Sequence, residues 1–129
     1  MEKGDTFLMG VPHGRKKHLW VLLSDPQKHG ACGVIVNFST DEERSGAECP
    51  LGVHEHPWFT EPTTWVCFGD ATLLTPESWP HILKGIACRV IIPERKCSAE
   101  LLAKVIQGAK TSSLQRYGGF RKDYLPFLD

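Results

Sequence analysis

The run CGVIVNF at residues 32–38, together with HLWVLL at residues 18–23, decides the fold of this 129-residue chain. Both runs are continuously apolar, rich in β-branched and aromatic residues, shorter than a typical helix and without a 3.6-residue period. The segment SDP at residues 24–26 ends one run, and KHG at residues 28–30 forms a turn before the other. The two runs therefore predict central strands of a β-sheet.

Shorter runs with turn residues between them predict more of the same sheet. The pair Gly69-Asp70 is interpreted as a turn joining two strands, and Pro93 as the residue that ends the last one. The polar segment 39–57 is expected to be a long loop of functional length. The further strands are expected at residues 6–9, 63–68, 71–74 and 89–92.

Two helices are expected, one before the last predicted strand and one after it. Thr75 as cap and Pro76 at the first helical position predict a short helix starting over residues 75–79. Ser98 as N-cap, Glu100 in the first turn and an apolar stripe at helical spacing predict a helix over about 98–112. The tail at 113–129 is expected to be irregular.

Five or six short strands followed by a helix predict a mainly β fold in a single domain, residues 1–129. We expect a small, strongly curved antiparallel sheet or barrel over about residues 4–95, capped by the C-terminal helix. A curled sheet of this kind brings the start of HLWVLL beside the tail of GVIVNF.

The composition excludes some partners and favours a compartment. Lys and Arg number 15, as do Asp and Glu, so a net charge of +0 excludes a polybasic carrier of nucleic acid. The five cysteines form no CxxC pair, and we expect most to be buried as small apolar residues. The sequence has an early acidic residue, no apolar signal-like region and no 18-residue apolar stretch. We therefore expect a protein of the reducing cytosol with free thiols.

A basic loop that runs into a predicted strand is one candidate site. Cations position the charge of a phosphodiester, and a histidine can move a proton near pH 7. The alternative is a solvated basic turn before a strand. The residues of this loop are Arg15, Lys16, Lys17 and His18.

Two hydroxyls follow the run GVIVNF. Ser39 and Thr40 at a strand end can donate hydrogen bonds to a phosphate oxygen. Ordinary turn chemistry is the alternative, since such side chains often bond the nearby backbone. In the turn predicted after the third strand, Asp70 is a candidate to orient a histidine or to share its proton, with a turn role as the alternative.

The long loop contains a third candidate group. Cys49, His54 and His56 are potential zinc ligands, but they supply three of the four ligands that a structural site needs. The alternative is a shaped turn at His56-Pro57-Trp58, in which Trp58 is packed and His56 caps the turn or lines a groove. A histidine beside an aromatic residue can also stack on an unpaired base.

In order along the chain, these segments resemble the PemK/MazF-like toxin family over about residues 4–112. That resemblance implies a small SH3-like barrel with a C-terminal helix. It also implies a metal-independent endoribonuclease of a toxin–antitoxin module, commonly a dimer inhibited by its antitoxin. The segments that carry it are Gly4-Asp5, the basic loop, HLWVLLS, GVIVNFST, TTWVCFGDATLL and SAELLAKVIQGA.

The resemblance also assigns roles to particular residues. Family members typically use an Arg just before the second strand and a Thr or Ser at the end of the third. Here His18 occupies the first position, while Ser39 or Thr40 matches the second. Cleavage by attack of a ribose 2′-hydroxyl would then use His18 as base or acid, Thr40 or Ser39 as phosphate donor, and His56 as second proton carrier or base platform. The implied substrate-binding residues are Arg15, Lys16, Lys17, Trp58 and Asp70.

Two other functions are compatible with these residues. The missing Arg and the neutral net charge favour a non-catalytic SH3-like module that binds a protein partner or nucleic acid. A zinc-dependent protein using Cys49, His54 and His56 is the other alternative. The nuclease hypothesis requires His18, Thr40 and His56 to converge on one concave surface, within reach of a phosphate.

Overall fold

The computed structural model describes residues 1–11, 16–45, 48–112 and 120–128, so the predicted cation Arg15 lies outside the described residues. Across these ranges the chain forms five strands, three α-helices and short 3-10 turns. The strands are β1 (Thr6–Gly10), β2 (Lys17–Leu22), β3 (Gly33–Ser39), β4 (Trp65–Leu74) and β5 (Ile92–Glu94). The α-helices are α1 (Glu42–Ser45), α2 (Trp79–Ala87) and α3 (Ala99–Lys110).

The five strands make one antiparallel sheet in the order β4-β3-β2-β1-β5. The predicted mainly β, antiparallel fold is therefore confirmed. Closure into a barrel is not: among the described residues no pairing joins β4 to β5, which form the two outer edges of the sheet. No helix in the described part of the chain has the length and apolar character needed to cross a membrane.

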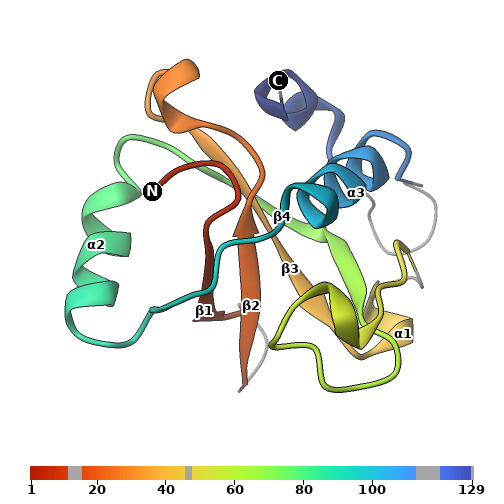
Figure 1. Ribbon diagram of the computed structural model, residues 1–129. Coiled ribbons are helices and arrows are strands. Elements are labelled where there is room, and N and C mark those ends of the chain that lie inside the picture. The colour runs from red at the N-terminus through yellow and green to blue at the C-terminus, as the bar shows by residue number, and fades with distance from the viewer. Residues whose placement is uncertain (12–15, 46–47, 113–119, 129) are drawn as a thin grey trace.

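Both faces of the sheet are covered, which explains why its central strands are continuously apolar. In β2, Leu19 and Val21 join the core under α3, whereas Trp20 and Leu22 join a second core under α2. Figure 1 shows α2 on one side of the sheet, and α3 with the C-terminal segment on the other. A strand that is buried on both sides has no polar face, so it shows no alternation in the sequence.

The turn predicted at residues 69–70 is wrong, because β4 is one continuous strand there. The sequence signal marks a bulge instead. Ile35 of β3 pairs with Thr72, and Asn37 pairs with Cys67. Between these pairs β3 has the single residue Val36, whereas β4 has residues 68–71. Gly and Asp suit such a bulge for the same conformational reasons that they suit a turn.

Both predicted boundaries of the last strand are displaced, and the way α2 ends explains the first. Arg89 takes a left-handed conformation (φ 61°), and the N–H groups of Val90 and Ile91 donate to the carbonyl of Gly85. These residues close the helix. The last strand consequently starts at Ile92 and not at residue 89. It also continues through Pro93 to Glu94, so the predicted end of the strand at Pro93 is wrong.

The two helices differ in how their starts compare with the prediction. α2 begins at Trp79 and not at residues 75–76, and the Ser78 side chain before it makes no cap hydrogen bond. The predicted N-cap of α3 is confirmed, because the Ser98 hydroxyl accepts a hydrogen bond from the Leu101 N–H at 3.1 Å. In the tail, the segment Lys122–Leu128 forms a 3-10 helix where irregular chain was expected, and Phe120 and Leu128 join the core under α3.

Candidate functional site

His18 lies where β2 and β3 separate. Their pairing runs from Leu22 opposite Ile35 to Trp20 opposite Asn37. Beyond that pair, two residues before Trp20 and one residue after Asn37, the His18 Nδ1 lies 2.9 Å from the main-chain carbonyl oxygen of Phe38. The imidazole thus replaces a ladder contact and holds the start of β2 beside the end of β3.

This contact fixes the tautomer of His18. A carbonyl oxygen only accepts, so Nδ1 carries the proton and donates it to the Phe38 oxygen. In the neutral ring Nε2 is then the nitrogen with the lone pair, and it is the one that can accept a proton. His18 is half-buried, so part of its side chain remains exposed.

The two predicted hydroxyls at the end of β3 differ in exposure. Ser39 is only 6% exposed, and its Oγ accepts a hydrogen bond from the Asp41 N–H at 3.0 Å. This is the turn chemistry that was the alternative for Ser39. Thr40 is exposed. Of the two, Thr40 is therefore the hydroxyl that a substrate can reach.

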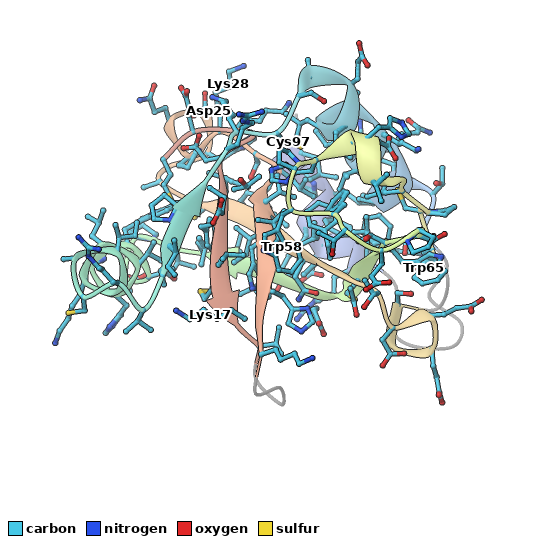
Figure 2. The ribbon with its side chains drawn as sticks, turned by 60° about the horizontal axis from the view of Figure 1, so that its bottom comes forward. Lys17, Asp25, Lys28, Trp58, Trp65 and Cys97 are labelled. Carbon is cyan, nitrogen blue, oxygen red and sulfur yellow. The ribbon has the colours of Figure 1, made fainter. Side chains whose placement is uncertain are left out.

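Two predicted cations lie at the same end of the sheet. Lys16 and Lys17 are exposed, and Lys17 pairs with Gly10 at the last register position of the β1–β2 pair. Figure 2 shows Lys17 at this end of the two strands. Positive charge, the His18 imidazole and the Thr40 hydroxyl thus lie at one end of the central strands.

His56 has a structural role and not the predicted role of a second proton carrier. It is 4% exposed, its Nε2 donates to the Arg95 carbonyl oxygen at 2.9 Å, and its Nδ1 accepts from the Trp58 N–H at 3.1 Å. The ring packs against Phe59. Both nitrogens are thus used inside the protein, and no contact described for His56 joins it to His18. The expected convergence of His18, Thr40 and His56 is therefore incomplete.

Trp58 remains a surface residue. Its side chain is 37% exposed, and it is one of the labelled residues in Figure 2. The neighbouring loop buries Phe59, which makes an edge contact with Phe38 of β3. The structure thus presents an aromatic surface on a loop whose other aromatic residue is anchored in the core.

Asp70 lies in the β4 bulge and faces Asn37 of β3. The Asn37 Nδ2 donates to the Asp70 Oδ2 at 2.9 Å. Asn37 is 0% exposed, and its Oδ1 has no hydrogen-bond partner among the described residues. Sequence reasoning missed Asn37, although the signal was present: an amide is out of place inside the apolar run GVIVNF.

The predicted zinc ligands do not form a cluster. Cys49 Sγ lies 3.9 Å from the Lys104 carbonyl oxygen, and burial raises the pKa of its thiol. His54 is exposed, while both nitrogens of His56 are bonded. In the ranges that the structure describes, no three or more His, Cys, Asp and Glu side chains are grouped to hold a metal ion.

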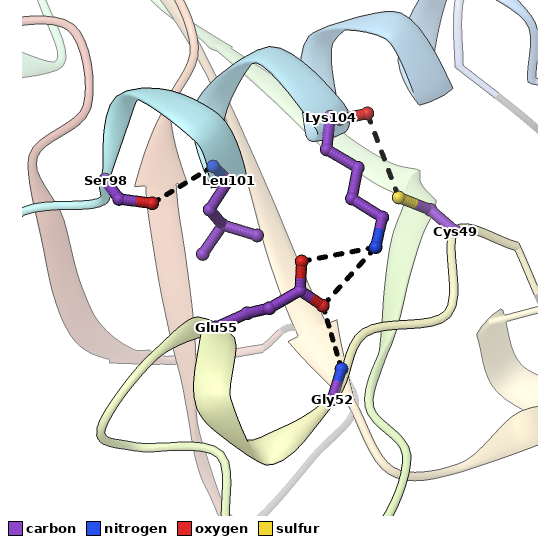
Figure 3. A network of polar contacts seen from close by, with 6 residues as sticks. All are labelled: Cys49, Gly52, Glu55, Ser98, Leu101 and Lys104. Atoms are coloured by element: carbon purple, nitrogen blue, oxygen red, sulfur yellow. Dashed lines mark hydrogen bonds and ion pairs between the residues drawn. The ribbon is translucent and has the colours of Figure 1, made fainter.

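The long loop is instead fastened to α3 by a polar network (Figure 3). The Glu55 carboxylate accepts hydrogen bonds from the Gly52 N–H at 2.8 Å and from the Lys104 Nζ at 3.2 Å. Although burial acts in the opposite direction, the Gly52 N–H and the Lys104 ammonium hold the pKa of the Glu55 carboxyl below its usual value. Much of the predicted functional loop therefore has a bracing role, and its residues 49–57 are called the brace loop below.

The comparisons with known proteins identify no relative of this chain. No protein-family model matches it, and neither a curated protein nor a solved structure does.

Proposed function

We propose that the chain is a metal-independent endoribonuclease that cleaves single-stranded RNA. In this proposal it is the toxin of a toxin–antitoxin module and a divergent relative of the PemK/MazF-like family, in which the five-stranded antiparallel sheet would correspond to the SH3-like barrel. The observation that supports it most is the contact of His18 Nδ1 with the Phe38 carbonyl. That contact leaves Nε2 as the basic nitrogen, beside the strand end that bears Thr40.

The proposed chemistry needs a proton carrier and groups that hold the phosphate. His18 Nε2 takes the proton of a ribose 2′-hydroxyl, and the 2′-oxygen attacks the adjacent phosphorus. The bond to the 5′-oxygen breaks, and the imidazolium returns the proton to that oxygen. The products are a 2′,3′-cyclic phosphate and a 5′-hydroxyl. Thr40 donates to a phosphate oxygen, while Lys16 and Lys17 stabilise the developing charge.

The remaining expectations of the resemblance belong to the same proposal. We infer a homodimer inhibited by a cognate antitoxin in the cytoplasm. Arg15, which lies outside the described residues, would add a third cation shortly before β2 in the sequence. Zero net charge favours short substrates or a local cationic groove over long-range capture of RNA.

Incubation of the purified protein with varied single-stranded RNAs in EDTA tests this proposal. The expected products carry a cyclic phosphate, and Thr40→Ala is expected to slow their formation. His54→Ala is a matched control, because His54 is an exposed histidine on the brace loop. RNA that stays intact across sequences would contradict the proposal.

A non-catalytic binding module is the second candidate, and two observations favour it. His56 is bonded in the interior and cannot serve as the second proton carrier, whereas Trp58 is 37% exposed. In this case Trp58→Ala abolishes binding to the partner, while His18→Ala leaves it intact. A growth assay separates the two functions, since loss of toxicity in His18→Ala supports catalysis.

A further inference from the structure

Asn37 carries a polar group whose burial is not compensated. It is 0% exposed and lies between the apolar residues Val36 and Phe38 in the central strand β3. Its Nδ2 is bonded to Asp70, and within the described residues its Oδ1 accepts no hydrogen bond. A buried carbonyl oxygen without a donor destabilises a protein, and an apolar side chain of similar size would avoid that penalty.

The β4 bulge supplies a second, independent observation. The three extra residues that β4 contains opposite Val36 place Asp70 where its carboxylate meets the Asn37 amide. Bulges of this kind re-aim a side chain and occur often beside functional sites. Two departures from regular packing, a buried oxygen without a donor and a bulged strand, therefore occur at one contact, the hydrogen bond between Asn37 and Asp70. That contact fixes the orientation of a half-buried carboxylate.

The position of this pair relates it to the proposed nuclease site. Asn37 directly precedes Phe38, whose carbonyl oxygen binds His18. Asp70 lies on the adjacent strand β4 and is bonded to Asn37. A base attached to a ribose that reacts at His18 would therefore lie on the side of β3 where β4 presents this carboxylate. A carboxylate repels phosphate and accepts hydrogen bonds, and in an RNA the N–H donors belong to the bases.

Guanine is the base that fits a fixed carboxylate best. It presents two adjacent donors, N1–H and the 2-amino group, which can bind both oxygens of one carboxylate. Uracil, adenine and cytosine each offer a single donor group on that edge. The geometry does not require Asp70 to lack other partners, since a carboxylate accepts about four hydrogen bonds.

We propose, building on the proposed nuclease function, that Asp70 reads an unpaired guanine of the RNA and that Asn37 is the positioning residue that holds its carboxylate. Asp70 makes the contact from its solvent-exposed side, and Asn37 acts only through Asp70. This positioning role accounts for a polar side chain at a fully buried position.

The test measures binding without cleavage. Uridine heptamers with 2′-O-methyl riboses cannot be cleaved, and they carry one central guanosine, inosine, adenosine or uridine. Fluorescence anisotropy is expected to show guanosine binding at least about fivefold more tightly than inosine, which lacks the 2-amino group. Asp70→Asn and Asn37→Leu are expected to reduce that ratio to about one, without weakening the binding of the all-uridine oligomer. Asp123→Asn, a change of an exposed carboxylate paired with Arg121, should leave the ratio unaltered.

Stability gives a readout that a purely structural Asn37 would not produce. The double variant Asn37→Leu/Asp70→Ser removes the orphaned oxygen together with its partner, so its resistance to urea is expected to equal or exceed that of the wild type. Guanosine preference retained in Asn37→Leu, or a much less stable double variant, would overturn the inference. Wild-type protein that cleaves RNA without a guanosine preference overturns the inference alone, whereas protein that neither binds nor cleaves RNA overturns the proposed function with it.

Discussion

The imidazole of His56 donates to the main-chain carbonyl of Arg95 at 2.9 Å, across 39 residues of sequence. The same carbonyl oxygen accepts the Thr6 hydroxyl of β1 at 2.5 Å. His56 therefore joins the brace loop to the segment after β5 and to the first strand. The contact explains why a histidine that resembles a catalytic group in sequence is buried.

His56→Ala is expected to lower the free energy of unfolding by about 2–4 kcal/mol. The substitution leaves the Arg95 carbonyl and the Trp58 N–H without their partner and removes a ring that packs on Phe59. Urea denaturation measures the loss. The exposed His54→Ala should change stability by less than about 0.5 kcal/mol. A His56→Ala protein as stable as the wild type would show that the ring is not a structural link.

Stability is expected to fall in acid partly through Glu55. Its folded-state pKa lies below the unfolded value, because Gly52 and Lys104 stabilise the carboxylate against the opposing effect of burial. The stabilisation is therefore present above the unfolded pKa and disappears as the pH falls through the folded pKa. Urea midpoints of wild type and Glu55→Gln should converge as the pH is lowered from 6 to about 3. A constant difference between the two proteins over this range would contradict the assignment.

Gly108→Ala is expected to destabilise the protein although alanine is the better helix former. A Cβ on Gly108 of α3 would lie 2.9 Å from Phe68 Cζ and 3.3 Å from Cys49 Sγ. Overpacking of this kind costs about 1–3 kcal/mol, more than the roughly 1 kcal/mol gained in helix propensity. Gly10→Ala is the control, because no atom lies within 4 Å of its added Cβ. Thermal unfolding of both variants checks the prediction, and equal melting temperatures would contradict the close approach of α3 to β4.

The cysteines are expected to react in an order set by burial. Burial raises the pKa of the Cys97 thiol to about 12, and the residue belongs to the core under α3. Cys88 is exposed at the end of α2. Because the thiolate is the reactive form, an aromatic disulfide reagent at pH 8 should label Cys88 rapidly and Cys97 only upon unfolding. Mass spectrometry of partly labelled protein identifies the sites, and early labelling of Cys97 would show that the core opens easily.

The central strands could be predicted from the sequence because burial on both faces of the sheet makes a strand apolar along almost its whole length. The runs containing Leu19 to Leu22 and Val34 to Phe38 could be recognised without knowing their partners. Local signals failed where the same residue types suit two different backbone structures. Gly69 and Asp70 suit a turn and a bulge equally, and only the pairing of β3 with β4 distinguishes the two.

The candidate site could be predicted only in part, for a related reason. His18 and His56 both looked like proton carriers, and what separates them is the set of atoms that each ring meets. The His18 ring meets the main chain at Phe38, while the His56 ring binds Arg95 and Trp58 with both nitrogens. These partners are distant in sequence, so no local pattern contains them.

His18→Asn is expected to separate the two roles of His18. An asparagine can present its Nδ2 near the position of the histidine Nδ1, so it can still donate to the Phe38 carbonyl, but it has no nitrogen that accepts a proton. RNA cleavage should therefore fall by about 10²–10⁴. The free energy of unfolding should stay within about 0.5 kcal/mol of the wild type, whereas His18→Ala should lose about 1 kcal/mol more. Full cleavage by a folded His18→Asn protein would show that His18 serves only to join β2 to β3, and the proton carrier would then have to be sought elsewhere.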